Sequence, residues 1–232
     1  MYFFDSSMLV LIPAIIFTMI VQFRVQHVFN KFSNKTNSMG ITGGEAARTV
    51  LNANGLYDVE INLLGGTDAL ENYYDPRNNT LNLSQVVFNS RSISAMCVAC
   101  HEAGHAIQHA KGYIPVKIRG ALVPITNFAS NISWTLILIG LILSTFTDIG
   151  SLLFDIGALC FIVVVLFQLI TLPVEFNASH RALVQMKKAE IVDRADLSGS
   201  KKVLHAAAMT YVAALATALS SLLRIFILRG DD

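Results

Sequence analysis

Two histidines and a glutamate stand at the spacing of a metal-dependent hydrolase in the sequence His101-Glu102-Ala103-Gly104-His105. Residues four apart share one face of an α-helix, so His101 and His105 can bind one metal ion together. Glu102 lies about 100° round the same turn, from where it can reach a metal-bound water without being a ligand. In this H-E-x-x-H arrangement two imidazoles hold Zn²⁺ and the carboxylate takes a proton from the water. The pattern predicts a zinc hydrolase with one Zn²⁺ per chain, unless the motif is a chance occurrence.

A third zinc ligand must come from elsewhere in the chain, because a catalytic zinc site has three protein ligands and one water. Glu175 is the best candidate, since it directly follows Leu172-Pro173 at the end of an apolar segment. Pro173 is tolerated in the first turn of a helix, so we expect a new helix with Glu175 near its start. A membrane hairpin would then leave His105 and return Glu175 to the same face. The alternative is a solvated glutamate favoured by the helix dipole.

Three polar residues that follow Glu175 are candidates for supporting roles. Ser179 lies one turn further on, so it could hydrogen-bond to a zinc-bound imidazole or back to its own turn. Asn177 and His180 are near enough to help hold a substrate oxyanion, although surface positions suit both residue types. His109 continues the histidine stripe, but one straight helix cannot wrap three ligands around an ion. We therefore predict that His109 lies at an interface.

The run from Ser92 to Ala110 predicts the helix that carries the motif, with Ser92 as its cap and a break at 112–115. Two strands beside this helix would matter, because an exposed strand edge can bind an extended peptide and lay its amide across the metal. The other predicted elements are a helix at 43–54 with Thr42 as cap and Gly55 as stop, strands at 57–64 and 80–84, a loop at 67–74, a turn at 75–79 and a helical turn at 85–89.

The composition predicts an integral membrane protein. Of 232 residues, 53% are hydrophobic and only 14% are charged, which is too apolar for an ordinary soluble domain. Four segments are long enough to cross a bilayer: 8–23, 123–146, 152–172 and 203–228. The last is interrupted by His205 and Arg224, and its many small Ala residues would equally suit a buried helix of a soluble subdomain. The first has no basic N-terminal region and no cleavage site, which indicates an uncleaved anchor.

The Lys and Arg residues predict the orientation. They follow the first segment, precede the second and follow the third, whereas the turn at 147–151 has none. This bias places residues 24–120 and 173–202, and with them the active site, in the cytoplasm. Cys97 and Cys100 fall on the same reducing side, so we expect no structural disulfide. With a net charge of +1 and no basic stripe, the chain is not expected to bind nucleic acid.

The sequence resembles the YugP family of membrane zinc metallopeptidases over nearly its whole length. The resemblance is carried by 73–77, 83–84, 101–108, 172–179 and 204–217. It implies a neutral zinc peptidase anchored in the membrane, with His101 and His105 as the zinc pair and Glu102 as the catalytic residue.

Residues 175–179 also resemble the third-ligand segment of the HtpX and prenyl-protein protease group, which supports Glu175 as a ligand. An acidic residue is typical of that group at the place of Ser179. In the YugP family Asp is usual where Asn177 stands and Arg where His180 stands, so no role is carried over to those two residues.

Together these patterns predict a mainly α integral membrane protein, with about four transmembrane helices and a small α+β zincin-like cytoplasmic catalytic domain in a bacterial cytoplasmic membrane. The expected parts are an anchor at 1–23, a catalytic region at 24–120, a transmembrane hairpin at 121–172, a cytoplasmic segment with the third ligand at 173–202, and a C-terminal Ala-rich helix at 203–232.

The predicted activity is that of a zinc metalloendopeptidase acting on proteins or peptides, membrane proteins among them, with Glu102 as general base. Cys97-Val98-Ala99-Cys100-His101 also matches the C-x-x-C-H signature of c-type haem attachment, which would indicate an electron-transfer protein. A zinc-binding membrane scaffold without turnover is the third hypothesis. Neither the cleavage specificity nor the oligomeric state is indicated by the sequence.

Overall fold

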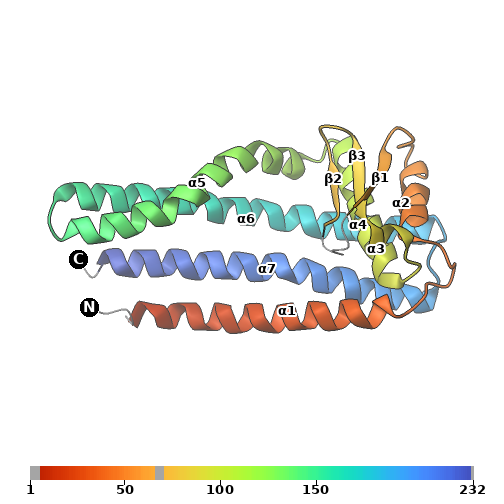
Figure 1. Cartoon of the computed structure of the whole chain (residues 1–232), viewed down its shortest axis with the longest axis horizontal. Coiled ribbons are helices and arrows are strands. Elements are labelled where there is room, and N and C mark those ends of the chain that lie inside the picture. The colour runs from red at the N-terminus through yellow and green to blue at the C-terminus, as the bar shows by residue number, and fades with distance from the viewer. Residues whose placement is uncertain (1–5, 66–70, 231–232) are drawn as a thin grey trace. The chain divides into compact units, whose positions relative to one another are not determined.

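The computed structural model of the chain describes residues 6–65 and 71–230. Four of its helices are long and apolar enough to cross a membrane, and a small mixed sheet has three strands. The predicted class, a mainly α membrane protein with a small α+β part, is confirmed. The elements, drawn in Figure 1, are a 3-10 helix Ser6–Leu11, α1 Ile12–Ser33, α2 Gly43–Asn52, β1 Glu60–Leu64, β2 Tyr73–Asp75, β3 Thr80–Ser84, α3 Gln85–Asn89, α4 Ile93–Ala110, α5 Ile114–Ser144, α6 Asp148–Lys188 and α7 Arg194–Gly230.

The described chain divides into two compact units. The first, which we call the helical unit, comprises residues 6–21, 117–173 and 211–230, and the second, which we call the site unit, comprises 22–65, 71–116 and 174–210. Each of the four predicted membrane segments lies largely within one of the four long helices, including the fourth segment in α7. The C-terminal segment thus also belongs to a helix that is long and apolar enough to cross a membrane.

The helical unit has a narrow core and an apolar exterior. Ile137 of α5, Phe154 of α6 and Ile225 of α7 are almost fully buried. A Cβ added at Gly157 would lie 2.8 Å from the Ile137 backbone nitrogen, so α5 and α6 pack closely there. Many large apolar side chains face outward, among them Ile142, Leu159, Leu166, Leu219, Leu223 and Phe226. Such an exterior suits contact with lipid rather than water.

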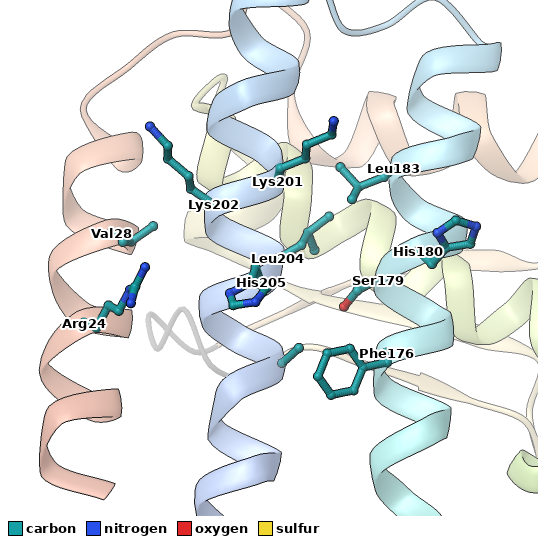
Figure 2. Close-up of a pocket in the computed structure, with 11 residues that line it drawn as sticks. Arg24, Val28, Phe176, Ser179, His180, Leu183, Lys201, Lys202, Leu204 and His205 are labelled. Carbon is teal, nitrogen blue, oxygen red and sulfur yellow. The ribbon is translucent and has the colours of Figure 1, made fainter. Parts of the chain in front are cut away.

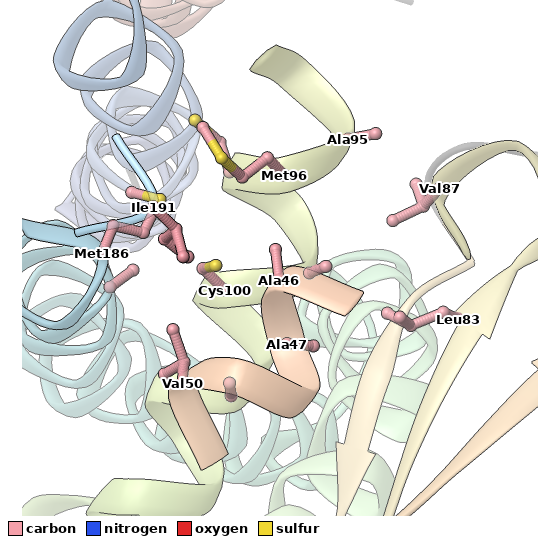
Figure 3. Close-up of a cluster of buried hydrophobic side chains, with 14 of the residues drawn as sticks. Ala46, Ala47, Val50, Leu83, Val87, Ala95, Met96, Cys100, Met186 and Ile191 are labelled. Atoms are coloured by element: carbon pink, nitrogen blue, oxygen red, sulfur yellow. The ribbon is translucent and has the colours of Figure 1, made fainter. Parts of the chain in front are cut away.

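The site unit is built around α4, which packs against α2 (Figure 3). Ala46, Ala47 and Val50 give α2 one small apolar face, and all three are fully buried. The predicted start of α2 is confirmed, because the Thr42 hydroxyl accepts from the Glu45 N–H while the Glu45 carboxylate accepts from the Thr42 N–H. This reciprocal cap satisfies two backbone donors that a helix start leaves unpaired.

The sheet has the order β1-β3-β2, with β3 parallel to β1 and antiparallel to β2. The strand predicted at 80–84 is β3, and all five of its residues are buried because it is central. The strand predicted at 57–64 is shorter and begins at Glu60.

The prediction of a loop at 67–74 is wrong at its end, where Tyr73–Asp75 forms β2; residues 67–70 lie outside the described chain. A three-residue strand is too short to show an alternating pattern, and β3 across the turn is what holds it in place.

The motif helix α4 begins and ends as predicted. The Ser92 hydroxyl accepts a hydrogen bond from the Ala95 N–H at 3.1 Å, which caps the helix start. After Ala110 the chain turns at Gly112, whose φ of +64° is costly for residues with a side chain. The next helix, α5, then begins at Ile114.

The helix break predicted at Pro173 is wrong, because α6 runs without interruption from Asp148 to Lys188. A proline inside a helix removes one backbone hydrogen bond, but long apolar helices accommodate it. Glu175 therefore lies deep inside α6 and not in a first turn. Its residue is only 1% exposed, so the alternative of a solvated glutamate stabilised by a helix dipole is wrong as well.

The motif helix α4 and the last part of α6 approach each other closely at Gly104. A Cβ added at Gly104 would lie 2.6 Å from the carbonyl oxygen of Ala178, which is backbone and cannot rotate away. Ala103, Ala178 and Ala182 are fully buried around this contact. The small residues allow the two helices to come close enough for side chains on both to share one site.

We expect Gly104→Ala to lower the free energy of unfolding by about 1–3 kcal/mol, because an added methyl must push two helices apart. The measurement is thermal unfolding in detergent, with Gly65→Ala as control, since a Cβ at Gly65 meets no atom of the described residues within 4 Å. Equal melting temperatures for both variants would contradict the close contact.

Candidate metal centre

Three side chains from two helices converge on one point in the site unit. His101 and His105 lie on α4 and Glu175 on α6, and their ligand atoms all lie within 4.8 Å of one another. The Glu175 Oε2 atom is 3.2 Å from His101 Nε2 and 3.5 Å from His105 Nε2. The two imidazole rings stand nearly perpendicular, at 88°. Their Nε2 atoms therefore face the carboxylate from different directions.

These separations suit a tetrahedral zinc ion. Ligand atoms 2.0–2.1 Å from zinc at tetrahedral angles lie about 3.4 Å apart. Both measured Nε2–Oε2 separations are close to this value, and imidazole nitrogen and carboxylate oxygen are ligands that zinc accepts. The imidazoles remain 14% and 12% exposed, whereas the Glu175 side chain is 2% exposed. The donor set therefore fits one zinc ion, and the imidazoles form the more accessible side of the cluster.

Ser179 fixes the orientation of the His101 ring. Its hydroxyl lies 3.2 Å from His101 Nδ1, on the opposite side of the ring from Glu175. With Nδ1 engaged in this way, Nε2 is the nitrogen that faces the ligand cluster. The structure thus brings Ser179 into the contact that was predicted for it.

Gln108 fixes the orientation of the His105 ring. His105 Nδ1 donates to Gln108 Oε1 at 2.9 Å, which leaves Nε2 as the nitrogen that faces Glu175. The Gln108 amide nitrogen donates to the Val174 carbonyl at 2.8 Å and to Asn177 Oδ1 at 3.0 Å. Both of its N–H groups are thus used on acceptors from α6, so only its oxygen can face His105.

Asn177 extends this network, and His180 does not join it. The Asn177 amide oxygen also accepts from Arg181 Nε at 2.6 Å, and the Arg181 guanidinium lies 5.8 Å from the centre of the Tyr113 ring. Among the described residues, Asn177 is linked to the metal ligands through Gln108. Its amide oxygen already accepts two hydrogen bonds, from Gln108 and from Arg181. His180 is exposed and lies outside the cluster.

Sequence reasoning did not identify Gln108 or Arg181 as parts of the site. The available signal for Gln108 was its position three residues after His105, which puts both on one helix face. His109, predicted to lie at an interface, packs its ring 5.5 Å from that of Tyr74 on β2.

The electrostatic environment of the cluster favours a positive charge. Burial lowers the pKa of His105, but its hydrogen bond to Glu175 and the charges of Glu102 and Glu175 outweigh burial and raise this pKa above its usual range. The position between the imidazoles and the two carboxylates thus stabilises added positive charge. A divalent cation suits such a position better than a neutral or anionic ligand does.

Glu102 lies on the same helix beside the cluster, next to β2. Burial raises the pKa of the Glu102 carboxyl above its usual range, although the imidazoles of His101 and His105 and a hydrogen bond from the Tyr74 backbone act in the opposite direction. The carboxylate is thus held toward the sheet, one position from His101, and no ligand atom of Glu102 joins the cluster. Glu102 therefore lies beside the ligand cluster without belonging to it.

The chain is similar to known proteins over nearly its whole length. Residues 7–230 match the family described as "putative neutral zinc metallopeptidase". The chain belongs to this family. It is also 44% identical over 213 residues to the "putative membrane protease YugP" of Bacillus subtilis, which covers 91% of this chain and 92% of the relative. No solved structure matches the chain significantly.

Membership of a zinc metallopeptidase family and four membrane-length helices establish an integral membrane protein of the zinc peptidase class. The haem hypothesis finds no support in the geometry. Cys97 and Cys100 are both free and fully buried in the core of the site unit, and burial raises the pKa of Cys97 to about 12. Thiols packed in this way are inaccessible to a porphyrin. His101, which the haem would need as a ligand, faces Glu175 instead.

We expect Gln108→Leu to weaken zinc binding by about 10–100-fold, because His105 loses the acceptor that orients its ring. Zinc affinity of the detergent-solubilised protein can be measured by competition with a chelator. Gln85→Leu is the matched control, since Gln85 is exposed on α3. An unchanged affinity in a Gln108→Leu protein with a normal melting temperature would show that Gln108 does not orient the ligand.

Proposed function

We propose that the chain is a zinc-dependent endopeptidase anchored in the membrane, with Glu102 as the general base. The observation that carries the proposal is the convergence of His101, His105 and Glu175, in which both imidazoles lie at tetrahedral spacing from the Glu175 carboxylate and Glu102 lies on the helix of the histidines. The chain's membership of a zinc metallopeptidase family supports the reaction class. The similarity to a relative described as a membrane protease supports the location of this activity in a membrane.

His101, His105 and Glu175 would hold one zinc ion and leave a fourth position for water. Bound there, the zinc would supply a Lewis acid that acidifies the water and polarises the scissile carbonyl. The contribution of the protein is to keep the ligands in place before the ion arrives. Ser179 and Gln108 orient the two imidazoles, and the packing of α4 on α6 sets their distance from Glu175.

Glu102 would move the proton in both halves of the reaction. Its carboxylate accepts the proton of the attacking water and then donates it to the departing amine. A carboxyl group whose pKa is raised toward neutrality is a stronger base for the first step. Burial raises the pKa of Glu102 in this direction, and the Tyr74 backbone contact holds the carboxylate in place.

The peptide substrate would bind as an extended strand along β2. Within the described residues β2 has one strand neighbour, β3, so the other edge of β2 has no strand partner. Tyr74 at the centre of β2 is also the residue whose backbone contacts Glu102. A strand paired with this edge would bind on both sides of the scissile amide, which is why we propose endopeptidase activity.

The catalytic side would face the cytoplasm. Arg24, Lys31 and Lys35 follow the first apolar segment, whereas the turn at 145–147 between α5 and α6 carries no basic residue. Glu175 follows Pro173 closely, so the site lies only a few residues beyond the end of an apolar segment. Membrane proteins with flexible cytoplasmic segments are thus the substrates that we propose.

We expect Glu102→Gln to keep zinc bound and to lower peptide cleavage by about 10²–10⁴-fold, because the amide cannot accept the water proton. Zinc content by mass spectrometry and cleavage of a quenched-fluorescence peptide library by the purified protein are the two measurements. Cells that carry Glu102→Gln should accumulate the natural substrates, which proteomics against wild-type cells would identify.

Glu60→Gln is the matched control, since Glu60 is exposed at the start of β1. A Glu102→Gln protein that cleaves at the wild-type rate would refute the role of Glu102. Wild-type protein with a full complement of zinc and no cleavage of any library member would favour the non-catalytic scaffold.

A further inference from the structure

A groove separate from the cluster of zinc ligands opens in the site unit between α1, α6 and α7 (Figure 2). Its volume is about 540 Å³, in the range of sites that hold small molecules. The groove, which we call the basic groove, is lined by Arg24, Val28, Phe176, Ser179, His180, Leu183, Lys201, Lys202, Leu204, His205 and Ala208. No function described above uses it, apart from the contact of Ser179 with His101.

The basic groove has cations at its rim and an apolar floor. Arg24, Lys201 and Lys202 are exposed, and none of the lining residues is acidic. Within the described chain, no carboxylate lies within ion-pairing distance of these three cations. Leu204 and Ala208 beneath them are 3% and 2% exposed. Three positive charges in one groove repel one another, and a bound anion would relieve that repulsion.

The side chains come from two sides of the groove. Figure 2 shows Arg24 extending from α1 toward α7, where His205 faces it, while Lys202 extends from the preceding turn of α7 toward α1 above Val28. Phe176 closes the α6 side with an apolar ring that is 39% exposed. The combination of a guanidinium, ammonium groups and apolar surface suits a ligand with a charged head and a hydrocarbon part.

The basic groove lies where three apolar segments end in the sequence. Arg24 follows the apolar segment that ends at Phe23, Phe176 lies just beyond Pro173, and Lys201 and Lys202 precede the apolar segment that begins at residue 203. These places lie near the points where α1, α6 and α7 pass from the helical unit to the site unit. Apolar spans end at the lipid headgroups, so a groove at these positions meets headgroups rather than bulk water.

We propose that the basic groove binds the phosphate headgroup of an anionic phospholipid. Arg24 and Lys202 contact the phosphate, Lys201 adds charge, and the glycerol end of the acyl chains lies on Leu204, Ala208 and Phe176. Basic pockets beside membrane helices bind anionic headgroups in this way. The bound lipid holds the site unit at the membrane surface. This inference does not depend on peptidase activity.

The test is lipid binding to the purified full-length protein by native mass spectrometry, with phosphatidylglycerol and phosphatidylcholine as probes. Wild type is expected to retain phosphatidylglycerol in preference to phosphatidylcholine. The variant R24Q/K201Q/K202Q is expected to lose about 10–100-fold in affinity for phosphatidylglycerol, because each basic residue near a membrane surface contributes several-fold.

The matched control is K31Q/K187Q/K188Q, which removes the same charge from exposed positions of α1 and α6 outside the groove. It is expected to bind phosphatidylglycerol within twofold of wild type. Equal loss in both triple variants, or no preference of wild type for phosphatidylglycerol, would overturn the proposal. Release of the lipid by millimolar inorganic phosphate would show a small-anion site instead. If the triple variant fails to fold, Arg24→Gln alone is expected to weaken binding about fivefold.

Discussion

The distance between α4 and the end of α6 is the constraint on which the site depends. Gly104 leaves no room for a Cβ against the Ala178 carbonyl, and Glu175 lies about one turn before Ala178 on the same helix. The imidazoles of α4 therefore reach the Glu175 carboxylate at 3.2 and 3.5 Å. Protein interiors are close-packed and do not stretch, so separating these helices by the width of a methyl group would move Glu175 out of tetrahedral range. Gly104, the small residue inside the motif, is thus as necessary for the geometry of the site as the metal-binding side chains are.

Buried polar groups tie this centre to the fold. Glu175 and Gln108 are almost fully buried, and both make hydrogen bonds or ionic contacts between α4 and α6. A buried carboxylate without a partner would be costly, so Glu175 needs the imidazoles or a cation. Zinc binding and the packing of the two helices should consequently reinforce each other, since an ion that binds only the folded protein stabilises it. Gln108 favours one arrangement of α4 on α6, because its two N–H groups and its oxygen each have one available partner.

The features that could be predicted from the sequence are those that depend on contacts between residues close together in the chain. The start of α4 at Ser92, the capped start of α2 at Thr42 and the four membrane segments follow from nearby residues, and the structure confirms them. The proximity of Glu175 to the histidines was also predicted, although for a helix that was expected to begin at Pro173. That boundary was wrong because an apolar helix accommodates a proline that a short soluble helix would not. The role of Gln108 could not be predicted, since it depends on α6 acceptors 66 and 69 residues away along the chain.

The coordination of zinc in the purified protein tests the central claim most directly. X-ray absorption at the zinc edge distinguishes nitrogen and oxygen ligands near 2.0–2.1 Å from sulfur near 2.3 Å. The account predicts two imidazole nitrogens and at least one carboxylate oxygen, with no sulfur, and a loss of carboxylate scattering in Glu175→Ala. Sulfur scattering would assign the metal to Cys97 and Cys100 instead. That result, or a wild-type spectrum in the Glu175→Ala protein, would contradict the proposed centre.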